Sequence, residues 1–209
     1  MREADPDVQH MLAFCAGDDS AFEPLFERWG RPLLHYLQRM TNDAATAEEL
    51  VQEAFLRVHR ARDRYKPDAK FSTWLYRIGT NLALNELRRP RRARPHASTD
   101  DDSDEARAPL QLVTDEPAAD VQLEVRRRAS RVEAVLGEIP ERQRMAIWLS
   151  AVEGMSYAEV AVALETSEKS VKSLIHRARV ALADRMAQAG DRGSEGDVGR
   201  TGKTREVER

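Results

Sequence analysis

The side chains best suited to binding chemistry lie between Met155 and Arg179. Helical spacing there places Val171, Leu174 and Ile175 on one face and leaves a cationic, hydrogen-bonding set on the other. That set comprises Lys169, Lys172, Ser173 and His176, with Arg177 and Arg179 at its flanks. Such groups can meet phosphates and base edges in the major groove of DNA. A cationic helix face is also often only a solvated surface, so this segment alone leaves both interpretations open.

The sequence around this set predicts a helix-turn-helix. Ser156 and Glu159 have the spacing of a capping box, which opens a short helix, and Ser167 can cap a second helix after a three-residue turn. Ala161 is small enough to let the two helices cross closely. Glu165 occupies the turn position where glycine usually supplies a left-handed conformation, at a cost of about 1 kcal/mol or more.

Charge is distributed unevenly along the chain. The formal net charge of −3 is unusual for a nucleic-acid binder, but residues 57–96 hold 12 basic and 3 acidic side chains, net +9. Residues 1–56 are net −7, residues 97–125 net −8, and residues 126–186 net +3. The segment 57–96 is therefore suited to meeting a polyanion.

Helices are the only elements that the spacing of apolar residues predicts. Phe22, Leu25, Phe26 and Trp29 form the stripe of an amphipathic helix, and no stretch alternates convincingly as a strand. Pro90 disfavours continuation of the helix that ends near Arg89. The expected helix starts are the capping pairs Ser20 with Glu23 and Thr46 with Glu49, and Ser72.

We therefore predict an all-α fold of two small helical domains, the second containing the helix-turn-helix. The first domain is expected over residues 1–95 and the second over 126–186. Residues 96–125 collect Pro, Ser, Asp and Ala without periodicity, which predicts a flexible, disordered acidic linker. Residues 187–209 are charged and glycine-rich, which predicts a disordered tail.

Several other classes of protein are disfavoured. No run is long and apolar enough to span a bilayer, so we expect a cytoplasmic protein. Cys15 is the single cysteine and has no partner for a disulfide or a zinc site, so no metal is expected. The sequence has no glycine-rich phosphate loop, nucleophile elbow or His-Glu-x-x-His motif, so neither an enzyme nor a cofactor is expected.

Both halves together resemble the extracytoplasmic-function (ECF) RNA polymerase sigma factors of the sigma-70 family. In the first half, AEELVQEAFLRVHRAR (47–62) and KFSTWLYRIGTNLALNELRR (70–89) are similar to the polymerase-binding and promoter-melting segments of that family. In the second half, IPERQRMAIWLSAVEGMSYAEVAVAL (139–164) and SVKSLIHRARVAL (170–182) are similar to its minus-thirty-five reading segment. The chain departs from the family pattern at three places. Glu165 replaces the usual glycine, Asn85 stands where an acidic residue is frequent, and the charged tail is long.

The resemblance implies a sigma factor that recruits core polymerase to promoters and melts the minus-ten element. The loop 66–71 would hold a flipped base, and the cations would support the strand. For Trp74, core packing is favoured over base contact, because Leu75 and Ile78 already define a nearby buried face. Tyr76 is expected to be more exposed than Trp74. The implied minus-ten residues are Lys66, Asp68, Lys70, Phe71, Trp74, Tyr76, Arg77, Asn81, Asn85, Arg88 and Arg89.

The resemblance also implies partners. The helix from Thr46 to Val58 would bind the clamp helices of the largest polymerase subunit, and the second domain would contact the flap of the second-largest subunit. An anti-sigma factor is a further possible partner. The implied polymerase-binding residues are Glu49, Gln52, Glu53 and Arg57.

Two other functions remain as alternatives. A free-standing helix-turn-helix regulator would need only the second half, and it would leave the melting-like segment unexplained. A zinc-containing anti-sigma regulator would need a His and Cys cluster that the sequence lacks.

Overall fold

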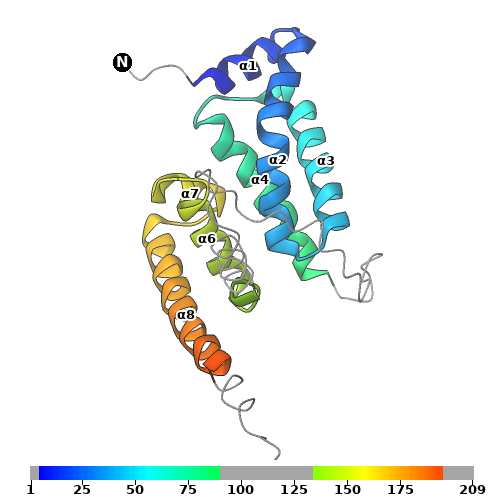
Figure 1. Ribbon diagram of the computed structural model, residues 1–209. Coiled ribbons are helices and arrows are strands. Elements are labelled where there is room, and N and C mark those ends of the chain that lie inside the picture. Colours follow the sequence, from blue (N-terminus) through cyan, green and yellow to red (C-terminus); the bar gives the residue numbers. More distant parts are fainter. Residues whose placement is uncertain (1–4, 90–133, 195–209) are drawn as a thin grey trace, which may run out of the picture.

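The computed structural model describes residues 5–89 and 134–194, and every regular element in these two ranges is a helix (Figure 1). The all-α fold predicted from the sequence is confirmed. The predicted acidic linker, residues 96–125, lies outside the described residues.

The first half is a bundle of four helices. They are α1 (Pro6–Cys15), α2 (Phe22–Thr41), α3 (Ala44–Arg60) and α4 (Phe71–Arg88), with 3-10 turns at Asp19–Ala21 and Arg62–Arg64. Helices α2 and α3 lie side by side, and α4 packs against both (Figure 1). Their buried faces form an apolar core, which is the main favourable contribution to folding of the bundle.

A tight turn reverses the chain between α2 and α3. Asn42 adopts the left-handed conformation, with φ at 55°, which asparagine tolerates better than most residues. The carboxylate of Asp43 then accepts a hydrogen bond of 2.7 Å from the amide of Thr46. The predicted cap at Thr46 is therefore wrong, because an acidic side chain three residues earlier already caps the helix.

Asp5 and Asp7 tie α1 to the rest of the bundle. The carboxylate of Asp7 is buried and accepts hydrogen bonds from the Trp29 indole at 3.0 Å and the Arg28 guanidinium at 3.2 Å. Asp5 caps α1 and also accepts from the amide of Phe71 at 3.3 Å. These contacts fix the start of α4, a helix on which many of the predicted site residues lie.

Two other local predictions differ from the structure. Ser20 does not cap α2, because the carboxylate of Asp18 accepts its amide at 3.1 Å and forms a 3-10 turn ahead of Phe22. Helix α4 begins at Phe71, one residue before Ser72, and Lys70 is its N-cap without a side-chain hydrogen bond. The predicted end of this helix is confirmed, since α4 ends at Arg88 ahead of Pro90.

The second half contains α6 (Glu141–Ala151), α7 (Tyr157–Ala163) and α8 (Glu168–Ser194). The capping box is present: the Glu159 carboxylate accepts the Ser156 amide at 2.8 Å, and the Ser156 hydroxyl accepts the Glu159 amide at 3.3 Å. The Ser167 hydroxyl accepts the amide of Ser170 at 3.2 Å, as predicted. Helices α7 and α8 form the predicted helix-turn-helix.

Helix α8 is longer than the sequence predicts. It continues to Ser194, past residue 186, where the sequence prediction placed the start of the disordered tail. Ala187, Gln188 and Ala189 are good helix formers, so the helix has a local reason to continue.

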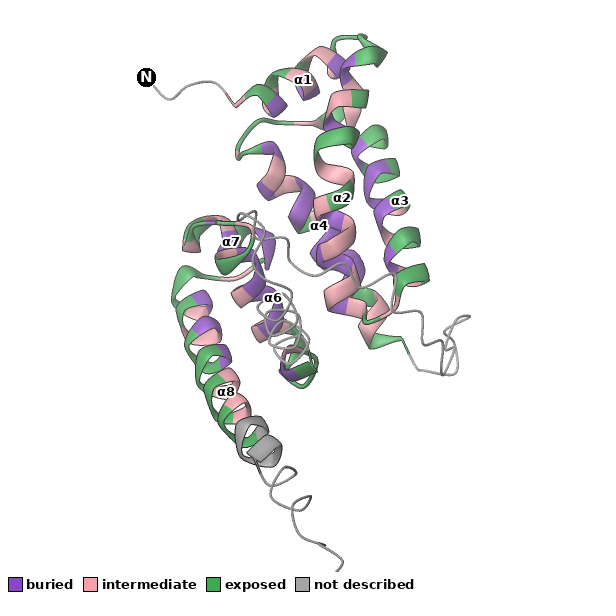
Figure 2. Ribbon diagram, viewed as in Figure 1, coloured by how far each residue is buried: buried purple, intermediate pink, exposed green. Residues whose placement is uncertain are grey.

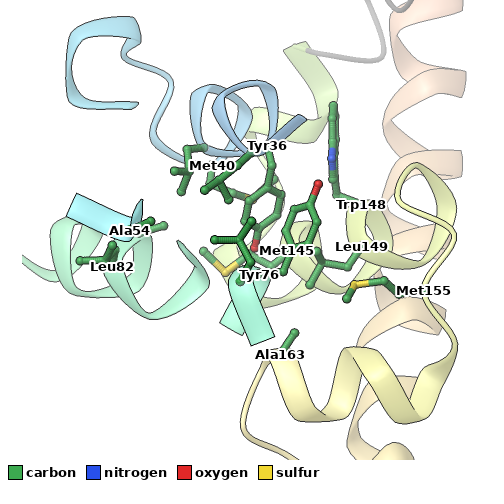
Figure 3. Packing of buried hydrophobic residues seen from close by; sticks show 14 of the residues in the cluster. Tyr36, Met40, Ala54, Tyr76, Leu82, Met145, Trp148, Leu149, Met155 and Ala163 are labelled. Atoms are coloured by element: carbon green, nitrogen blue, oxygen red, sulfur yellow. The ribbon is translucent and has the colours of Figure 1, made fainter. Parts of the chain in front are cut away.

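The two halves pack against each other in the structure, although the sequence predicts only separate bundles on a flexible tether. Their buried residues form one cluster that includes Tyr36 and Tyr76 from the first half and Met145, Leu149 and Met155 from the second (Figure 3). Helix α4 contacts α7, and α2 contacts α6, across the boundary between the halves. Figure 2 shows buried positions on all four of these helices. Packing of the two halves thereby removes apolar surface of both from water.

Candidate nucleic-acid interface

The outer face of α8 presents most of the predicted cations to solvent (Figure 2). The side chains of Val171, Ile175 and Ala178 are buried on the opposite face, which fixes the rotation of the helix about its axis. Ser173 is half-buried, and its hydroxyl donates to the carbonyl of Lys169 at 3.1 Å. The exposed predicted residues are Lys169, Lys172, His176, Arg177 and Arg179.

The turn before α8 keeps a left-handed residue despite its side chain. Glu165 has φ at 49°, the conformation that glycine adopts at least cost. The amide of Thr166 donates to the carbonyl of Ala161 at 2.9 Å, which closes the end of α7. The turn therefore has the geometry of a helix-turn-helix, with glutamate at the position that glycine usually occupies.

The loop before α4 has exposed polar residues next to a cluster of aromatic side chains. Lys66, Asp68 and Lys70 are exposed, whereas Phe71 is buried. The Trp74 ring is half-buried between Tyr65, at 4.9 Å between centroids, and Phe71, at 6.0 Å. Trp74 thus takes part in packing while one part of its ring stays accessible.

Sequence reasoning missed Tyr65. The hydroxyl of Tyr65 is buried and has no hydrogen-bond partner. The hydroxyl of Thr73, the residue before Trp74, is also buried without a partner. Burial, followed by the charge of Asp5, raises the pKa of Tyr65 to about 12. An aromatic residue just after a predicted helix was the only signal, and it is a weak one.

The prediction that Tyr76 is the more open aromatic residue is wrong. Tyr76 is 1% exposed, and its ring packs at right angles to those of Trp29 and Tyr36. Its hydroxyl donates to the carboxylate of Glu153, and burial raises the pKa of this phenol. Tyr76 is covered because the second half of the chain packs against α4, a contact that local spacing does not encode.

Other predicted residues of α4 also meet the second half. Arg77 pairs with Glu165 at 2.7 Å, Asn81 hydrogen-bonds the same carboxylate, and Lys70 pairs with Glu159 at 2.8 Å. The hydrogen bonds from Arg77 and Asn81 hold the pKa of the Glu165 carboxyl below its usual value. Farther along the helix, Asn85, Arg88 and Arg89 are exposed, and Arg89 pairs with Glu86 at 3.0 Å.

The predicted polymerase-binding face of α3 is largely exposed. Glu49, Gln52 and Arg57 are exposed, and Glu53 is half-buried. The Arg57 guanidinium donates to Glu53 at 2.7 Å and lowers the pKa of that carboxyl. Opposite them, Ala54 and Phe55 are buried and Leu50 is half-buried.

Two apolar residues beside this face are exposed, which the sequence did not predict. Phe26, placed in the buried stripe by its spacing, is 49% exposed, and its ring contacts that of Phe55 with 4.9 Å between the ring centroids. Leu56 on α3 is also 49% exposed. Both apolar side chains are therefore accessible at the surface to a protein partner.

Two further kinds of site are absent from the residues that the structure describes. None of their helices is long and apolar enough to cross a membrane. These residues also contain no cluster of three or more His, Cys, Asp or Glu side chains that could hold a metal ion.

Comparison with known proteins decides the family. Residues 25–93 match the model of Sigma-70 region 2, and residues 129–182 match that of Sigma-70, region 4. The ECF RNA polymerase sigma factor SigM of Mycobacterium tuberculosis is 36% identical over 178 residues, covering 85% of this chain and 83% of its own. The chain is an ECF sigma factor of the sigma-70 family.

Other sigma factors are similar to this chain over a comparable share of its length. The RNA polymerase sigma factor NccH of Alcaligenes xylosoxydans is 33% identical, covering 85% of this chain and 94% of its own. The ECF sigma-E factor of Escherichia coli is 31% identical over 81% of this chain and 88% of its own. Sigma factors are transcription initiation factors without catalytic activity, so this ECF sigma factor directs RNA polymerase to promoters and is not an enzyme.

Solved structures of sigma factors have the same fold. CnrH in complex with the cytosolic domain of CnrY superposes with a TM-score of 0.61 at 27% identity, over 89% of this chain and 99% of CnrH. RpoE of Bartonella quintana, solved with the anti-sigma factor NepR, gives a TM-score of 0.57 at 22% identity, over 79% of this chain and 96% of RpoE. The helical fold of the ECF sigma factor is therefore shared with both proteins.

Proposed function

We propose that this ECF sigma factor divides promoter recognition between α4 and α8. The domain over residues 1–95 would bind and melt the minus-ten element, and the domain over residues 126–186 would read the minus-thirty-five element. The observation that carries the proposal is the exposed cationic face of α8 in a helix-turn-helix. The proposed reading residues are Lys169, Lys172, Ser173, His176, Arg177 and Arg179.

The loop before α4 is the proposed site for an unstacked minus-ten base. The half-buried Trp74 and its neighbour Tyr65 offer aromatic surface for stacking, and the exposed Lys66 and Lys70 offer positive charge for the strand. The exposed Arg88 and Arg89 would follow the phosphates of the same strand. Asp68, Phe71, Tyr76, Arg77, Asn81 and Asn85 complete the proposed site.

Core polymerase is bound in this proposal by the exposed side of α3 and by the second domain. Glu49, Gln52, Glu53 and Arg57, with the exposed Phe26 and Leu56, would meet the clamp helices of the largest subunit. The second domain would meet the flap of the second-largest subunit. Because the polymerase works in the cytoplasm, that compartment is the proposed location.

An anti-sigma factor is a further proposed partner of this chain. CnrH, with 27% identity, was solved in complex with the cytosolic domain of another protein, CnrY. The exposed apolar residues Phe26 and Leu56 provide surface for such a protein. The polymerase and an anti-sigma factor would then compete for α3.

The proposal is tested by mixing the purified chain with bacterial core polymerase, followed by gel filtration and run-off transcription from a genomic promoter pool. Co-elution and promoter-specific transcripts support it. Specific binding to duplex DNA without any association with polymerase would contradict it.

A matched pair of variants tests the role of α8. Lys172→Ala removes one cation from the proposed reading face, and Arg31→Ala removes one exposed cation from α2. We expect Lys172→Ala to weaken binding to the minus-thirty-five duplex by roughly 1 kcal/mol or more, and Arg31→Ala to leave it unchanged. Equal losses from the two variants would contradict the assignment of α8 as the reader.

A further inference from the structure

Helix α4 begins without a cap from its own N-cap residue. That residue is Lys70, whose side chain makes no capping hydrogen bond to the helix. The first amide groups of a helix have no acceptor within the helix, and they carry partial positive charge. An acidic side chain from elsewhere in the chain can therefore stabilise the start of α4.

Asp5 supplies that acceptor from 66 residues away. Its Oδ2 accepts the amide of Phe71, the first residue of α4, at 3.3 Å, and its Oδ1 accepts the amide of Asp7 at 3.0 Å. One carboxylate thus caps two helices, α1 and α4. Asparagine or serine at residue 5 would offer one acceptor oxygen in place of two, and could serve only one of the two amides in this geometry.

Helix α1, which Asp5 caps, is itself anchored to the bundle. The buried carboxylate of Asp7 accepts hydrogen bonds from Trp29 and Arg28 of α2. Helix α1 also contacts α4 and the 3-10 turn at Arg62–Arg64, on the two sides of the loop before α4 (Figure 1). The carboxylate of Asp5 therefore connects the start of α4 to a helix that is already fixed in the first half.

The charge of Asp5 also reaches the aromatic pair proposed to receive an unstacked base. It is the second cause, after burial, of the raised pKa of Tyr65. The ring of Tyr65 lies before the loop and that of Trp74 lies in the first turn of α4, with 4.9 Å between their centroids. A shift of the start of α4 would change this separation, and recognition groups need to be held within about 0.5 Å of their productive positions.

We propose that Asp5 is a positioning residue for the minus-ten base site, where it holds the start of α4 and thereby sets the position of Trp74 relative to Tyr65. The inference rests on the proposed minus-ten role of this loop and of α4. Asp5 acts through the amide of Phe71 and makes no contact with DNA. Its loss changes which minus-ten bases are preferred, and it leaves the reading of the minus-thirty-five element by α8 as it was.

The test compares two aspartates that cap helical segments with the same local spacing. Asp5→Asn and Asp5→Ser keep an acceptor for the amide of Asp7, and with it the cap of α1, but lose the second oxygen. Asp18→Asn is the matched control, because Asp18 accepts the amide of Ser20 at 3.1 Å and caps only the 3-10 turn that follows it. All three substitutions remove one negative charge from the first half, so the comparison cancels the effect of charge on DNA binding.

Each full-length variant is assembled with core polymerase and transcribes a promoter pool with randomised minus-ten and minus-thirty-five elements, in which a barcode in the transcript identifies its promoter. Transcript abundance gives the base preference at every position. We expect Asp5→Asn and Asp5→Ser to reduce the preference at one or two minus-ten positions by roughly two- to tenfold, the range for one lost hydrogen bond. The minus-thirty-five preference is expected to stay unchanged, and Asp18→Asn is expected to match the unmodified chain at both elements.

A purely structural role for Asp5 gives a different result. If Asp5 only stabilises the fold, its variants lower transcription from all promoters by the same factor and keep the base preferences, which would overturn the inference. An equal loss of minus-ten preference in Asp18→Asn would also overturn it, because the effect would then come from charge and not from the contact with Phe71.

The unmodified holoenzyme separates these outcomes from failure of the proposed function. If it prefers particular minus-ten bases and the Asp5 variants share that preference, the positioning role is wrong and the sigma function stands. If the unmodified holoenzyme has no minus-ten preference, the proposed minus-ten role fails, and the positioning role fails with it.

Discussion

At the scale of single residues, one hydroxyl pair lies deep in the first bundle. The hydroxyls of Tyr36 and Thr80 are 2.8 Å apart, both residues are fully buried, and they join α2 to α4. Burial raises the pKa of the Tyr36 phenol well above its ordinary value. A buried polar group is tolerated when its partner is present and becomes costly when the partner is removed.

Thr80→Val removes one member of this pair and leaves the Tyr36 hydroxyl buried without a partner. We expect it to lower the free energy of unfolding by about 1–3 kcal/mol, measured by urea denaturation. The double variant Tyr36→Phe, Thr80→Val removes both hydroxyls and is expected to recover part of that loss. Additive losses in the double variant would show that the two hydroxyls do not interact.

Tyr65 predicts a loss of stability at alkaline pH. Its pKa is raised from 10.0 to about 12 in the folded protein. The contribution of this raised pKa to the stability of the fold is therefore fully present below pH 10. It is lost as the pH rises through 12, because the unfolded chain releases the proton at a lower pH. We expect the melting temperature to fall above pH 10, and Tyr65→Phe, which loses no hydrogen bond, to reduce that fall. An identical pH profile for the variant would exclude Tyr65 as a source.

At the scale of elements, the separation between α2 and α4 depends on one glycine. A Cβ at Gly79 would lie 2.8 Å from Cδ1 of Leu33, which is fully buried and has little room to move. A Cβ at Gly30, within α2, would lie 3.8 Å from the ring of Phe26, which is ordinary contact. The close approach of α4 to α2 therefore requires glycine at residue 79 but not at residue 30.

Substitution by alanine at these two glycines should change stability in opposite directions. Gly79→Ala is expected to destabilise the bundle by about 1–3 kcal/mol through overpacking against Leu33. Gly30→Ala is expected to stabilise it by about 0.5–1 kcal/mol, because alanine is the better helix former. Urea denaturation of both variants checks the signs, and stabilisation by Gly79→Ala would show that Leu33 moves aside freely.

Local elements were predicted well where their cause lies within a few residues. The capping box of Ser156 and Glu159, the end of α4 before Pro90 and the turn at Glu165 all depend on neighbours in the sequence. The caps at Asp18 and Asp43 were missed because serine or threonine with a following glutamate gave the same pattern nearby. Spacing also placed Phe26 in the core, although its stripe is wider than the buried face.

At the scale of the whole molecule, the contacts between the halves could not be predicted from the sequence. Tyr76 and Glu153 are separated by 77 residues, and Arg144 and Met40 by 104, so no periodicity links them. The family resemblance implied which residues would meet DNA, and it carried no information about their contacts with the other half of the chain. The contact combines shared apolar burial with a few partly exposed ion pairs, and the two contributions respond differently to salt.

Two salts at equal ionic strength separate these contributions. Sodium chloride and sodium sulfate both screen the pairs of Lys70 with Glu159 and Arg77 with Glu165, but sulfate also strengthens apolar burial. Because Tyr76, Met145 and Leu149 are almost fully buried between the halves, we expect chloride to increase the radius of gyration and sulfate to leave it compact. Small-angle X-ray scattering of the full chain measures this. Equal expansion in both salts would mean that the ion pairs, and not the buried surface, hold the halves together.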